Sequence, residues 1–480
     1  MGKADYNIIV IGGGSAGLVS SYIASTVKAK VALLEKHKMG GDCLNTGCVP
    51  SKALIRSTKI ISYIKRHREF GLKSASVEFN FSEIMERVQS VIKKIEPHDS
   101  IKRYTKLGVD CITGEAKIVS PHEVEVNGKT LSSKNIIVAT GAHPAIPPIP
   151  GLGRVDFLTT DNLWNIRELP KRLLVAGGGP IGSELAQCFA RLGSQVTQVE
   201  LMPDILSRED DEFSQALRRR FANEGIDVRI NTKCKEIVVE NGKQFMLCEK
   251  DGLDQRIEFD KVLIALGRTA NSRGFGLENI GLKLGLSGTI CVDDYLRTTK
   301  YKNIYACGDV VGPYQFTHIA AHQAWYCAVN ALFSPFKKFR INYSIIPWCT
   351  FTDPEIARVG LNEKEAKEQG LTYEVTRYEI SGLDRAITDS EDQGMVKVLT
   401  EPGKDRVLGV TIMGHHAGEL ITEYISAMKH GIGLNKILGT IHIYPTMAEA
   451  NKFAAGIWKK NHAPNKILKL AKKFHAWRRQ

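Results

Sequence analysis

Cys43 and Cys48 are the residues of this chain whose type and spacing most directly indicate chemistry. Gly47 and Pro50 frame a turn that enters a helix, because proline is tolerated in the first turn of a helix. Cys48 is then at a helix N-terminus with Lys52 one turn further on, and both features favour the reactive thiolate. The pattern predicts a redox-active disulfide within the segment Gly40-Gly41-Asp42-Cys43-Leu44-Asn45-Thr46-Gly47-Cys48-Val49-Pro50-Ser51-Lys52.

Metal ligation is the alternative function for this cysteine pair. A structural zinc site uses about four ligands, and the chain offers no second cysteine pair at ligand spacing. We therefore expect no metal site. The other eight cysteines stand singly in the sequence, and in a reducing compartment each is expected to be a small packed hydrophobe. They are Cys111, Cys188, Cys234, Cys248, Cys291, Cys307, Cys327 and Cys349.

Two segments of the chain resemble each other in their order of strand pattern, glycine-rich turn, helical stretch, second strand pattern and acidic residue. The first acid, Glu35, follows Gly14 by 21 residues, and the second, Glu200, follows Gly179 by the same 21 residues. A single glycine motif is weak evidence, but two in the same frame with the same acid spacing are strong evidence. The turns read Gly12-Gly13-Gly14-Ser15-Ala16-Gly17 and Gly177-Gly178-Gly179-Pro180-Ile181-Gly182.

These turns have the chemistry of dinucleotide binding. The first glycine permits a tight turn, the second lets backbone approach a pyrophosphate, and the third packs helix against strand. The helix N-terminus faces the phosphates, and the acid accepts hydrogen bonds from a ribose. Connecting turns alone would explain neither the repetition nor the acids, so we predict two bound dinucleotides. The candidate residues are Gly12, Gly14, Ser15, Ala16, Gly17, Glu35 and Lys36 for one, and Gly177, Gly179, Pro180, Ile181, Gly182 and Glu200 for the other.

Length and composition indicate a multidomain globular protein. At roughly 150 residues per domain, 480 residues suggest about three domains. The net charge of +13 comes without a zinc-ligand pattern or a nucleic-acid motif, so a basic surface and a charged tail explain it better than a nucleic-acid partner. No apolar stretch approaches the roughly 20 residues of a membrane span, and no hydrophobic leader precedes the first strand pattern. We expect a cytoplasmic protein.

Proline and glycine punctuate the chain at residues 143–151, and the composition changes again near Pro347. Beyond that point the pattern is α+β, with a strand expected at 394–399 and a helix at 418–430. Residues 464–480 form a basic amphipathic pattern with apolar residues at helical spacing. Contact of this tail with anionic lipid is one reading, and packing on the protein's own dimer is the one that we favour.

The cysteine segment resembles that of the class I flavoprotein disulfide reductases, which include dihydrolipoamide dehydrogenase, glutathione reductase and mercuric reductase. The resemblance covers roughly residues 6–460. Further motifs that carry it are Val138-Ala139-Thr140-Gly141, Ala265-Leu266-Gly267-Arg268, Asn303-Ile304-Tyr305-Ala306-Cys307-Gly308-Asp309 and Phe351-Thr352-Asp353-Pro354-Glu355-Ile356-Ala357.

The resemblance implies an α/β fold with two Rossmann-like dinucleotide-binding domains, for FAD and NAD, and a C-terminal α+β dimerisation domain. The domains expected on this basis are an FAD-binding domain at 1–150 with a second part at 271–343, an NAD(P)-binding domain at 151–270, an interface domain at 344–463, and the tail at 464–480. A homodimer follows, since the family completes each active site with residues of the partner subunit.

The resemblance also implies roles for individual residues. Cys48 would face the flavin as the charge-transfer thiolate, and Cys43 would exchange with the substrate. Lys52 would lie near the flavin ring and pair with Glu184, while Asp309 would hold the ribityl chain. The further cofactor-binding residues expected in this way are Gly41, Asp42, Thr140, Gly141, Gly267, Arg268, Gly308 and His318.

The sequence departs from the family near its end, where a catalytic histidine normally stands five residues before a glutamate. Here Glu449 is present, but Tyr444 occupies the histidine position. A tyrosine with a pKa near 10 stays protonated at neutral pH and is a poor general base. His442 is an alternative base, or else a structural histidine. Mercuric reductases resemble this chain in carrying tyrosine here, but the C-terminal cysteine pair of those enzymes has no counterpart after Cys349.

We interpret the chain as an FAD-dependent oxidoreductase that passes electrons between NAD(P)H and a small thiol, disulfide or soft-metal acceptor through Cys43 and Cys48. NADH is expected over NADPH, because Glu200 would repel a 2′-phosphate and is followed by Leu201 and Met202 rather than arginines. A dihydrolipoamide dehydrogenase that uses His442 is the first alternative. A membrane-surface or scaffold flavoprotein with little turnover is the second.

Overall fold

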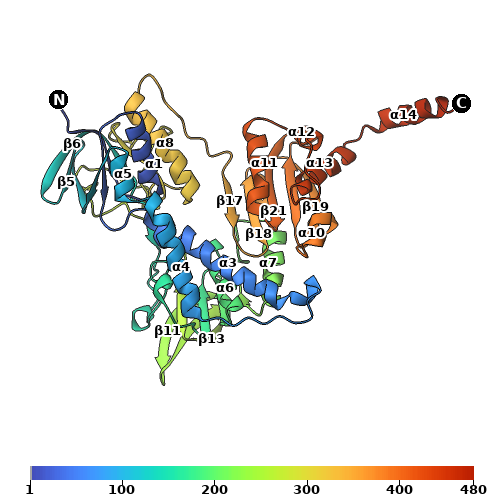
Figure 1. Ribbon diagram of the computed structural model, residues 1–480, viewed down its shortest axis with the longest axis horizontal. Helices are drawn as coiled ribbons and strands as arrows, with labels where there is room; N and C mark the ends of the chain where they lie inside the picture. The colour runs from blue at the N-terminus through green and yellow to red at the C-terminus, as the bar shows by residue number, and fades with distance from the viewer. Residues whose placement is uncertain (1–2) are drawn as a thin grey trace. The chain divides into compact units, whose positions relative to one another are not determined.

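The structure, a computed structural model, describes residues 3–480 and divides them into two compact units (Figure 1). The first unit consists of the chain up to Lys65, with Ser76–Ile205 and Phe221–Tyr343. The second consists of Arg66–Ala75, Leu206–Arg220 and Ser344–Gln480. The first unit therefore holds the cysteine pair and both glycine motifs, and the second holds Tyr444 and its neighbours.

The first glycine motif forms the predicted strand, turn, helix and strand: β1 (Tyr6–Ile11), α1 (Ser15–Thr26) and β2 (Val31–Glu35). Ile8, Ile9 and Val10 have no exposed surface, which is typical of a parallel strand covered on both faces. The parallel part of this sheet has the order β3-β2-β1-β6, with β16 beside β6. Its other strands are β3 (Val109–Thr113), β4 (Ala116–Ser120), β5 (Glu123–Val126), β6 (Lys129–Val138) and β16 (Ile304–Ala306).

The second glycine motif repeats this arrangement with β8 (Arg172–Ala176), α6 (Pro180–Arg191) and β9 (Gln195–Val199). The sheet is parallel in the order β10-β9-β8-β14. An antiparallel sheet, β11-β12-β13, is inserted in the chain between β10 and β14. The remaining strands are β10 (Asp227–Arg229), β11 (Lys233–Glu240), β12 (Lys243–Lys250), β13 (Leu253–Phe259), β14 (Lys261–Ile264), and the pair β7 (Ala142–Pro144) with β15 (Arg268–Ala270).

Helices of the first unit connect these sheets to the cysteine segment. The short α2 (Gly41–Asn45) leads into α3 (Cys48–Lys65), which packs against α4 (Phe81–Ile95) and α6. Asn80 caps α4 by accepting a hydrogen bond from the Ser82 N–H. Helix α8 (Thr317–Phe333) packs against α1. The unit also contains α5 (Ile101–Lys106).

The second unit is built on one antiparallel sheet in the order β17-β18-β21-β20-β19. Its strands are β17 (Pro347–Thr350), β18 (Glu355–Gly360), β19 (Glu374–Glu379), β20 (Met395–Thr400) and β21 (Val407–Gly414). The strand and helix that the sequence predicted at 394–399 and 418–430 are β20 and α11, each displaced by one residue. The helices are α7 (Asp211–Asn223), α9 (Glu363–Glu368), α10 (Asp384–Thr388), α11 (Ala417–Lys429), α12 (Leu434–Gly439) and α13 (Glu449–Asn461).

The C-terminal tail is helical over α14 (Asn465–Trp477), as its periodicity predicted. None of its residues is buried within this chain. Among residues 3–480, no helix combines the length and the apolar character needed to cross a bilayer.

Candidate functional site

The cysteine pair lies where one short helix ends and another begins. Cys43 is half-buried in α2, and Cys48 is the exposed first residue of α3. Gly47 makes the connection, with its N–H donating to the carbonyl of Asp42 at 2.7 Å. Both cysteines are thiols in this structure. The predicted position of Cys48 at a helix N-terminus is confirmed.

The two sulfurs have opposite acidities. The Cys43 thiol donates a hydrogen bond to the Cys48 sulfur, and this bond contributes most to lowering the pKa of Cys48 to about 6. A hydrogen bond with the hydroxyl of Thr317, 3.4 Å away, and the positive charge of Lys52 lower that pKa further, although burial opposes them. The same bond to Cys48, together with burial, raises the pKa of Cys43. Cys48 is therefore the sulfur poised to be a thiolate at neutral pH.

Lys52 and Glu184 meet, as the family resemblance implied. The Lys52 Nζ lies 2.9 Å from the Glu184 Oε2, and the glutamate side chain is 6% exposed. Lys52 lies one turn after Cys48 on α3, while Glu184 lies on α6 after the second glycine turn. This ion pair thus joins the cysteine helix to the second nucleotide motif.

A guanidinium group stands between two acids of the predicted cofactor set. Arg268 lies 2.8 Å from Asp42 and 3.6 Å from Asp309. Burial raises the pKa of Asp309, and the charge of Arg268 partly offsets that rise. Asp42 directly precedes Cys43, while Arg268 follows β14 and Asp309 follows β16. The ion pairs of Arg268 therefore connect the cysteine segment to the residues that come after these two strands.

The acids of the two glycine motifs make matching hydrogen bonds. Glu35 accepts from the Gly13 N–H at 2.6 Å and from the His37 N–H at 2.7 Å. Glu200 accepts from the Gly178 N–H at 2.6 Å and from the Met202 N–H at 2.8 Å. Each carboxylate is held against its glycine turn, where its remaining lone pairs can accept hydrogen bonds from a ribose.

The glycines themselves fit bound dinucleotides. A Cβ at Gly17 would lie 1.7 Å from the carbonyl oxygen of Gly12, so helix and turn touch there. A Cβ at Gly179 would meet no atom within 4 Å, and one at Gly14 would meet only the Gly41 backbone at 3.8 Å. The middle glycine of each motif therefore faces open space, where a pyrophosphate can approach the backbone. The residues present fit the two groups predicted from the sequence.

The residues predicted near the C-terminus lie in the second unit. The Tyr444 hydroxyl donates to the Asp384 carboxylate at 3.1 Å, and this bond, with the negative charges of Asp384 and Glu449, raises the pKa of Tyr444. The phenol side chain is exposed, whereas Glu449 is buried. The phenol of Tyr444 is thus a weaker acid here than that of a free tyrosine, so still less phenolate is present at neutral pH.

His442 has both ring nitrogens engaged. Nδ1 lies 3.0 Å from the carbonyl of Thr440, and Nε2 lies 3.0 Å from a carboxylate oxygen of Glu423. Its side chain is 5% exposed. Both ring nitrogens of His442 thus already have hydrogen-bond partners within the chain.

Sequence reasoning missed several contacts and one feature of the cysteines. Thr317 contacts Cys48, and Asp384 contacts Tyr444, yet neither residue stands near its partner in sequence. All eight cysteines that stand singly in the sequence are free thiols, as expected, but four of them meet in pairs in the fold. The thiols of Cys234 and Cys248 share a hydrogen bond, and so do those of Cys307 and Cys327, because folding brings together residues that are distant in the chain.

One group of three acids within residues 3–480 is close enough to hold a metal ion: Asp210, Glu212 and Glu363. A lysine already fills it, because the Lys397 Nζ lies 2.7 Å from Asp210, 2.5 Å from Glu212 and 2.6 Å from Glu363. The ammonium group supplies the positive charge that a cation would bring. This cluster is a buried ion-pair network of the second unit.

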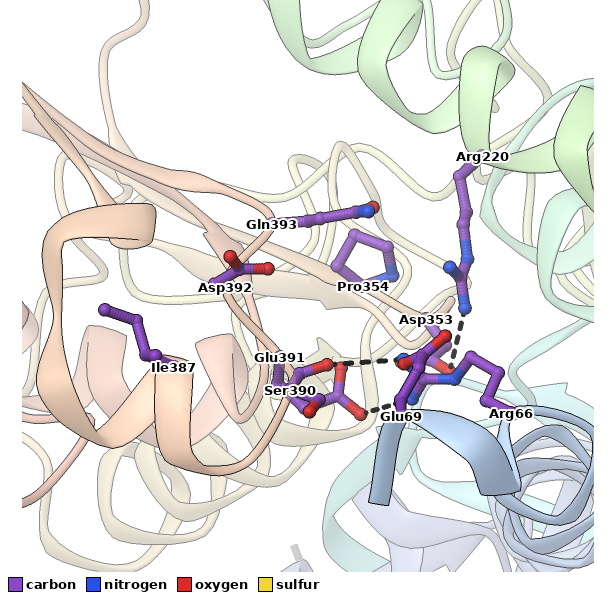
Figure 2. A pocket seen from close by; sticks show the side chains of 10 residues that line it. All are labelled: Arg66, Glu69, Arg220, Asp353, Pro354, Ile387, Ser390, Glu391, Asp392 and Gln393. Atoms are coloured by element: carbon purple, nitrogen blue, oxygen red, sulfur yellow. Dashed lines mark hydrogen bonds and ion pairs between the residues drawn. The ribbon is translucent and has the colours of Figure 1, made fainter. Parts of the chain in front are cut away.

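The second unit also contains a cavity of about 320 Å³ (Figure 2). Arg66 pairs with Glu391 at 2.8 Å and with Glu69 at 3.0 Å, and Arg220 lies 4.0 Å from Asp353. The other lining residues are Pro354, Ile387, Ser390, Asp392 and Gln393. No residue predicted as catalytic or cofactor-binding lines this cavity.

Comparison with known proteins identifies two family segments. Residues 6–324 match the family described as pyridine nucleotide-disulphide oxidoreductase, and residues 346–455 match its dimerisation domain. Among curated relatives, a mercuric reductase of Staphylococcus aureus is 34% identical over 94% of this chain and 82% of its own length. A dihydrolipoyl dehydrogenase of Chlamydia pneumoniae is 34% identical over 93% of this chain and 95% of its own length.

Solved structures give the same result. The HOCl-induced flavoprotein disulfide reductase RclA of Escherichia coli is 26% identical and superposes with a TM-score of 0.84, over 94% of this chain and 100% of that one. LpdA of Mycobacterium tuberculosis is also 26% identical, with a TM-score of 0.85 over 94% of this chain and 99% of that one. The predicted α/β fold class is confirmed. The finer division at residues 150, 270 and 343 stays a prediction.

Proposed function

Because this chain belongs to the pyridine nucleotide-disulphide oxidoreductase family, we propose that it passes electrons from NADH through FAD to the Cys43–Cys48 pair and then to a small acceptor. The family assignment makes it an oxidoreductase that binds FAD and a pyridine nucleotide. The observation that carries the proposal is the placement of Cys48 at the start of α3, in contact with the Cys43 thiol and one turn before Lys52, where its pKa is lowered to about 6.

The chain's own residues divide the work of the proposed reaction. FAD supplies a two-electron relay between the nicotinamide and the disulfide when it is bound. Opening the disulfide leaves a thiolate on Cys48 and a thiol on Cys43, and Lys52 stabilises the thiolate by its charge. Glu184 holds Lys52 in place through their ion pair. Cys43 then exchanges with the acceptor, as the family's cysteine motif implies.

An acceptor screen tests the proposal as a whole. The FAD-loaded enzyme would be mixed with NADH and, in turn, lipoamide, small aliphatic disulfides and soft metal ions, and NADH oxidation followed by absorbance. Turnover with at least one acceptor that disappears in Cys43→Ser is the expected result. Rapid flavin reduction with no cysteine-dependent acceptor would contradict the proposal. Slow flavin reduction would favour the scaffold alternative.

The preference for NADH is the first specific prediction. Glu200 is positioned beside Gly178, where a 2′-phosphate would meet a like charge that can cost several kcal/mol. We expect kcat/KM to be higher for NADH than for NADPH. Glu200→Gln keeps an oxygen for the Gly178 N–H but removes the charge, so it should bring the two values closer. A wild-type kcat/KM that is higher for NADPH would refute the assignment.

The acidity of Cys48 predicts a pH dependence. Its folded pKa of about 6 lies below that of a free cysteine, so the thiolate is present above that value and is lost as the pH falls through it. The thiolate-dependent long-wavelength absorbance of the two-electron-reduced enzyme should therefore fade with a midpoint near pH 6. Thr317→Val, which removes the hydroxyl 3.4 Å from Cys48, should move this midpoint upward. An absorbance that is constant from pH 8 to about pH 5 would contradict the prediction.

We propose that the C-terminal helix packs on a second copy of the chain. The dimerisation domain supports a homodimer, and α14 carries Ile467, Leu470, Phe474 and Trp477, an apolar stripe that stays exposed among residues 3–480 of one chain. Deleting residues 464–480 should weaken the dimer in sedimentation velocity at low protein concentration. Anionic vesicles should sediment the full-length and truncated proteins equally poorly. Tail-dependent vesicle binding would instead favour lipid contact, at about 1 kcal/mol per basic residue near the surface.

A dihydrolipoamide dehydrogenase remains the second candidate, since relatives with that activity in their names are as similar to this chain as the mercuric reductases. That activity needs a base for thiol protons. The bonds of His442 to Thr440 and Glu423 weigh against it as this base.

A further inference from the structure

Cys234 and Cys248 lie directly opposite each other on neighbouring antiparallel strands. Their pairing depends on a β-bulge. From Glu236 onward, β11 and β12 pair in one register, which if continued would set Lys235 opposite Cys248. The register shifts between Cys234 and Glu236, so that Cys234 takes that place instead. One extra residue on the bulged strand thus brings two thiols face to face.

The separation suits a disulfide. Residues directly opposite each other on antiparallel strands have Cα atoms about 4.5–5.5 Å apart, within the roughly 4.4–6.8 Å that a disulfide spans. The side chains already touch, since the two thiols share a hydrogen bond that raises the pKa of Cys234 and lowers that of Cys248. Little movement is needed for the sulfurs to bond.

The surroundings make one of the two sulfurs accessible. Cys248 has no exposed surface and packs with Ile237 and Met246 in the core of this sheet, whereas Cys234 is partly exposed. The strand also begins beside the second glycine motif, because the Thr232 N–H donates to the carbonyl of Glu200 at 2.9 Å. A small oxidant can therefore reach Cys234. Cys248 lies beside it as the thiol that can react with the oxidised sulfur.

We propose that Cys234 and Cys248 form a second redox-active pair, which a hydroperoxide converts reversibly to a disulfide. Cys234 passes its proton along the shared hydrogen bond to the Cys248 sulfur and attacks a peroxide oxygen as its thiolate, the O–O bond breaks, and a sulfenic acid forms with release of an alcohol or water. Cys248 attacks the sulfenic sulfur, the S–S bond forms, and water leaves. The two thiols lose two electrons and two protons in total, and the hydroperoxide is reduced by the same two electrons.

The experiment is peptide mapping of the FAD-loaded enzyme after treatment with hydrogen peroxide and blocking of free thiols. Trypsin cuts after Lys233, Lys235, Lys243 and Lys250, so the disulfide would join the dipeptide 234–235 to the peptide 244–250. We expect this linked product to become the major form of both peptides and to be lost on treatment with dithiothreitol. The readout does not depend on NADH turnover, so its result is separate from that of the proposed function.

Two matched controls sharpen the test. Cys307 and Cys327 also share a hydrogen bond, but neither has exposed surface, so this pair should stay reduced under the same treatment. In Cys248→Ser, Cys234 should stop at the sulfenic acid and be trapped by dimedone. The inference is overturned if Cys234 and Cys248 remain blocked as free thiols while Cys43 and Cys48 are oxidised. It is also overturned if the Cys307–Cys327 pair oxidises just as fast.

Discussion

Replacing Cys48 with serine is expected to abolish the long-wavelength absorbance that appears when NADH reduces the enzyme, and to lower acceptor turnover by at least ~10³-fold. The absorbance requires a thiolate beside the flavin, and Cys48 is the sulfur whose pKa is lowered to about 6. Serine cannot ionise at neutral pH, so neither the thiolate nor the disulfide can form. NADH should still reduce the flavin, because that half-reaction precedes the cysteines. Stopped-flow spectroscopy measures both events.

Cys43→Ser is the matched variant, because it removes the other half of the same disulfide. The serine hydroxyl can replace the Cys43 thiol as a hydrogen-bond donor to Cys48, and Thr317 and Lys52 keep their effect on its pKa. A thiolate band should therefore be present even before reduction. Equal loss of the band in both variants would overturn the assignment of roles, while leaving the disulfide itself in place.

Local patterns in the sequence predicted the parts of the site that depend on neighbouring residues. Gly17 must lack a side chain because its helix touches the carbonyl of Gly12, and both residues belong to one turn. Cys48 starts a helix because Gly47 and Pro50 adjoin it. Pairing of Lys52 with Glu184 was predicted only through the family resemblance, since the residues are 132 positions apart.

The contacts that the sequence could not predict depend on register and on long-range packing. If the register that β11 and β12 share from Glu236 onward continued unchanged, Lys235 would lie opposite Cys248. The bulge shifts the register, so Cys234 lies opposite Cys248 instead. No residue type at 234–236 signals that irregularity. Asp384 likewise reaches Tyr444 from a helix 60 positions earlier, so the choice of Asp384 over Glu449 as its hydrogen-bond partner depends on tertiary structure.

The hydrogen bond between Tyr444 and Asp384 decides whether Tyr444 can take part in proton transfer. The hydrogen bond to Asp384 raises the pKa of the phenol, so Tyr444 cannot accept a proton from a substrate thiol near neutrality. Dihydrolipoamide oxidation by the wild type should therefore be slow, since general acid–base catalysis is typically worth ~10²–10⁴-fold. An imidazole has a pKa near 6.5, and the nearby charges of Asp384 and Glu449 would favour its protonated form.

We expect Tyr444→His to raise dihydrolipoamide turnover by at least ~10-fold, within the range that a positioned base supplies, and to give it a pH dependence near neutrality. Tyr444→Phe, which loses only the hydroxyl, should leave turnover unchanged, and flavin reduction by NADH should be unaffected in both variants. His442→Ala should cost stability, because it leaves Glu423 without this partner in a nearly buried site, yet change turnover little. The opposite outcome would contradict this prediction. In that case the wild type would already oxidise dihydrolipoamide rapidly, and the His442→Ala variant would still reduce its flavin with NADH but no longer oxidise dihydrolipoamide. The base would then be His442, and the enzyme a dihydrolipoamide dehydrogenase with a displaced histidine.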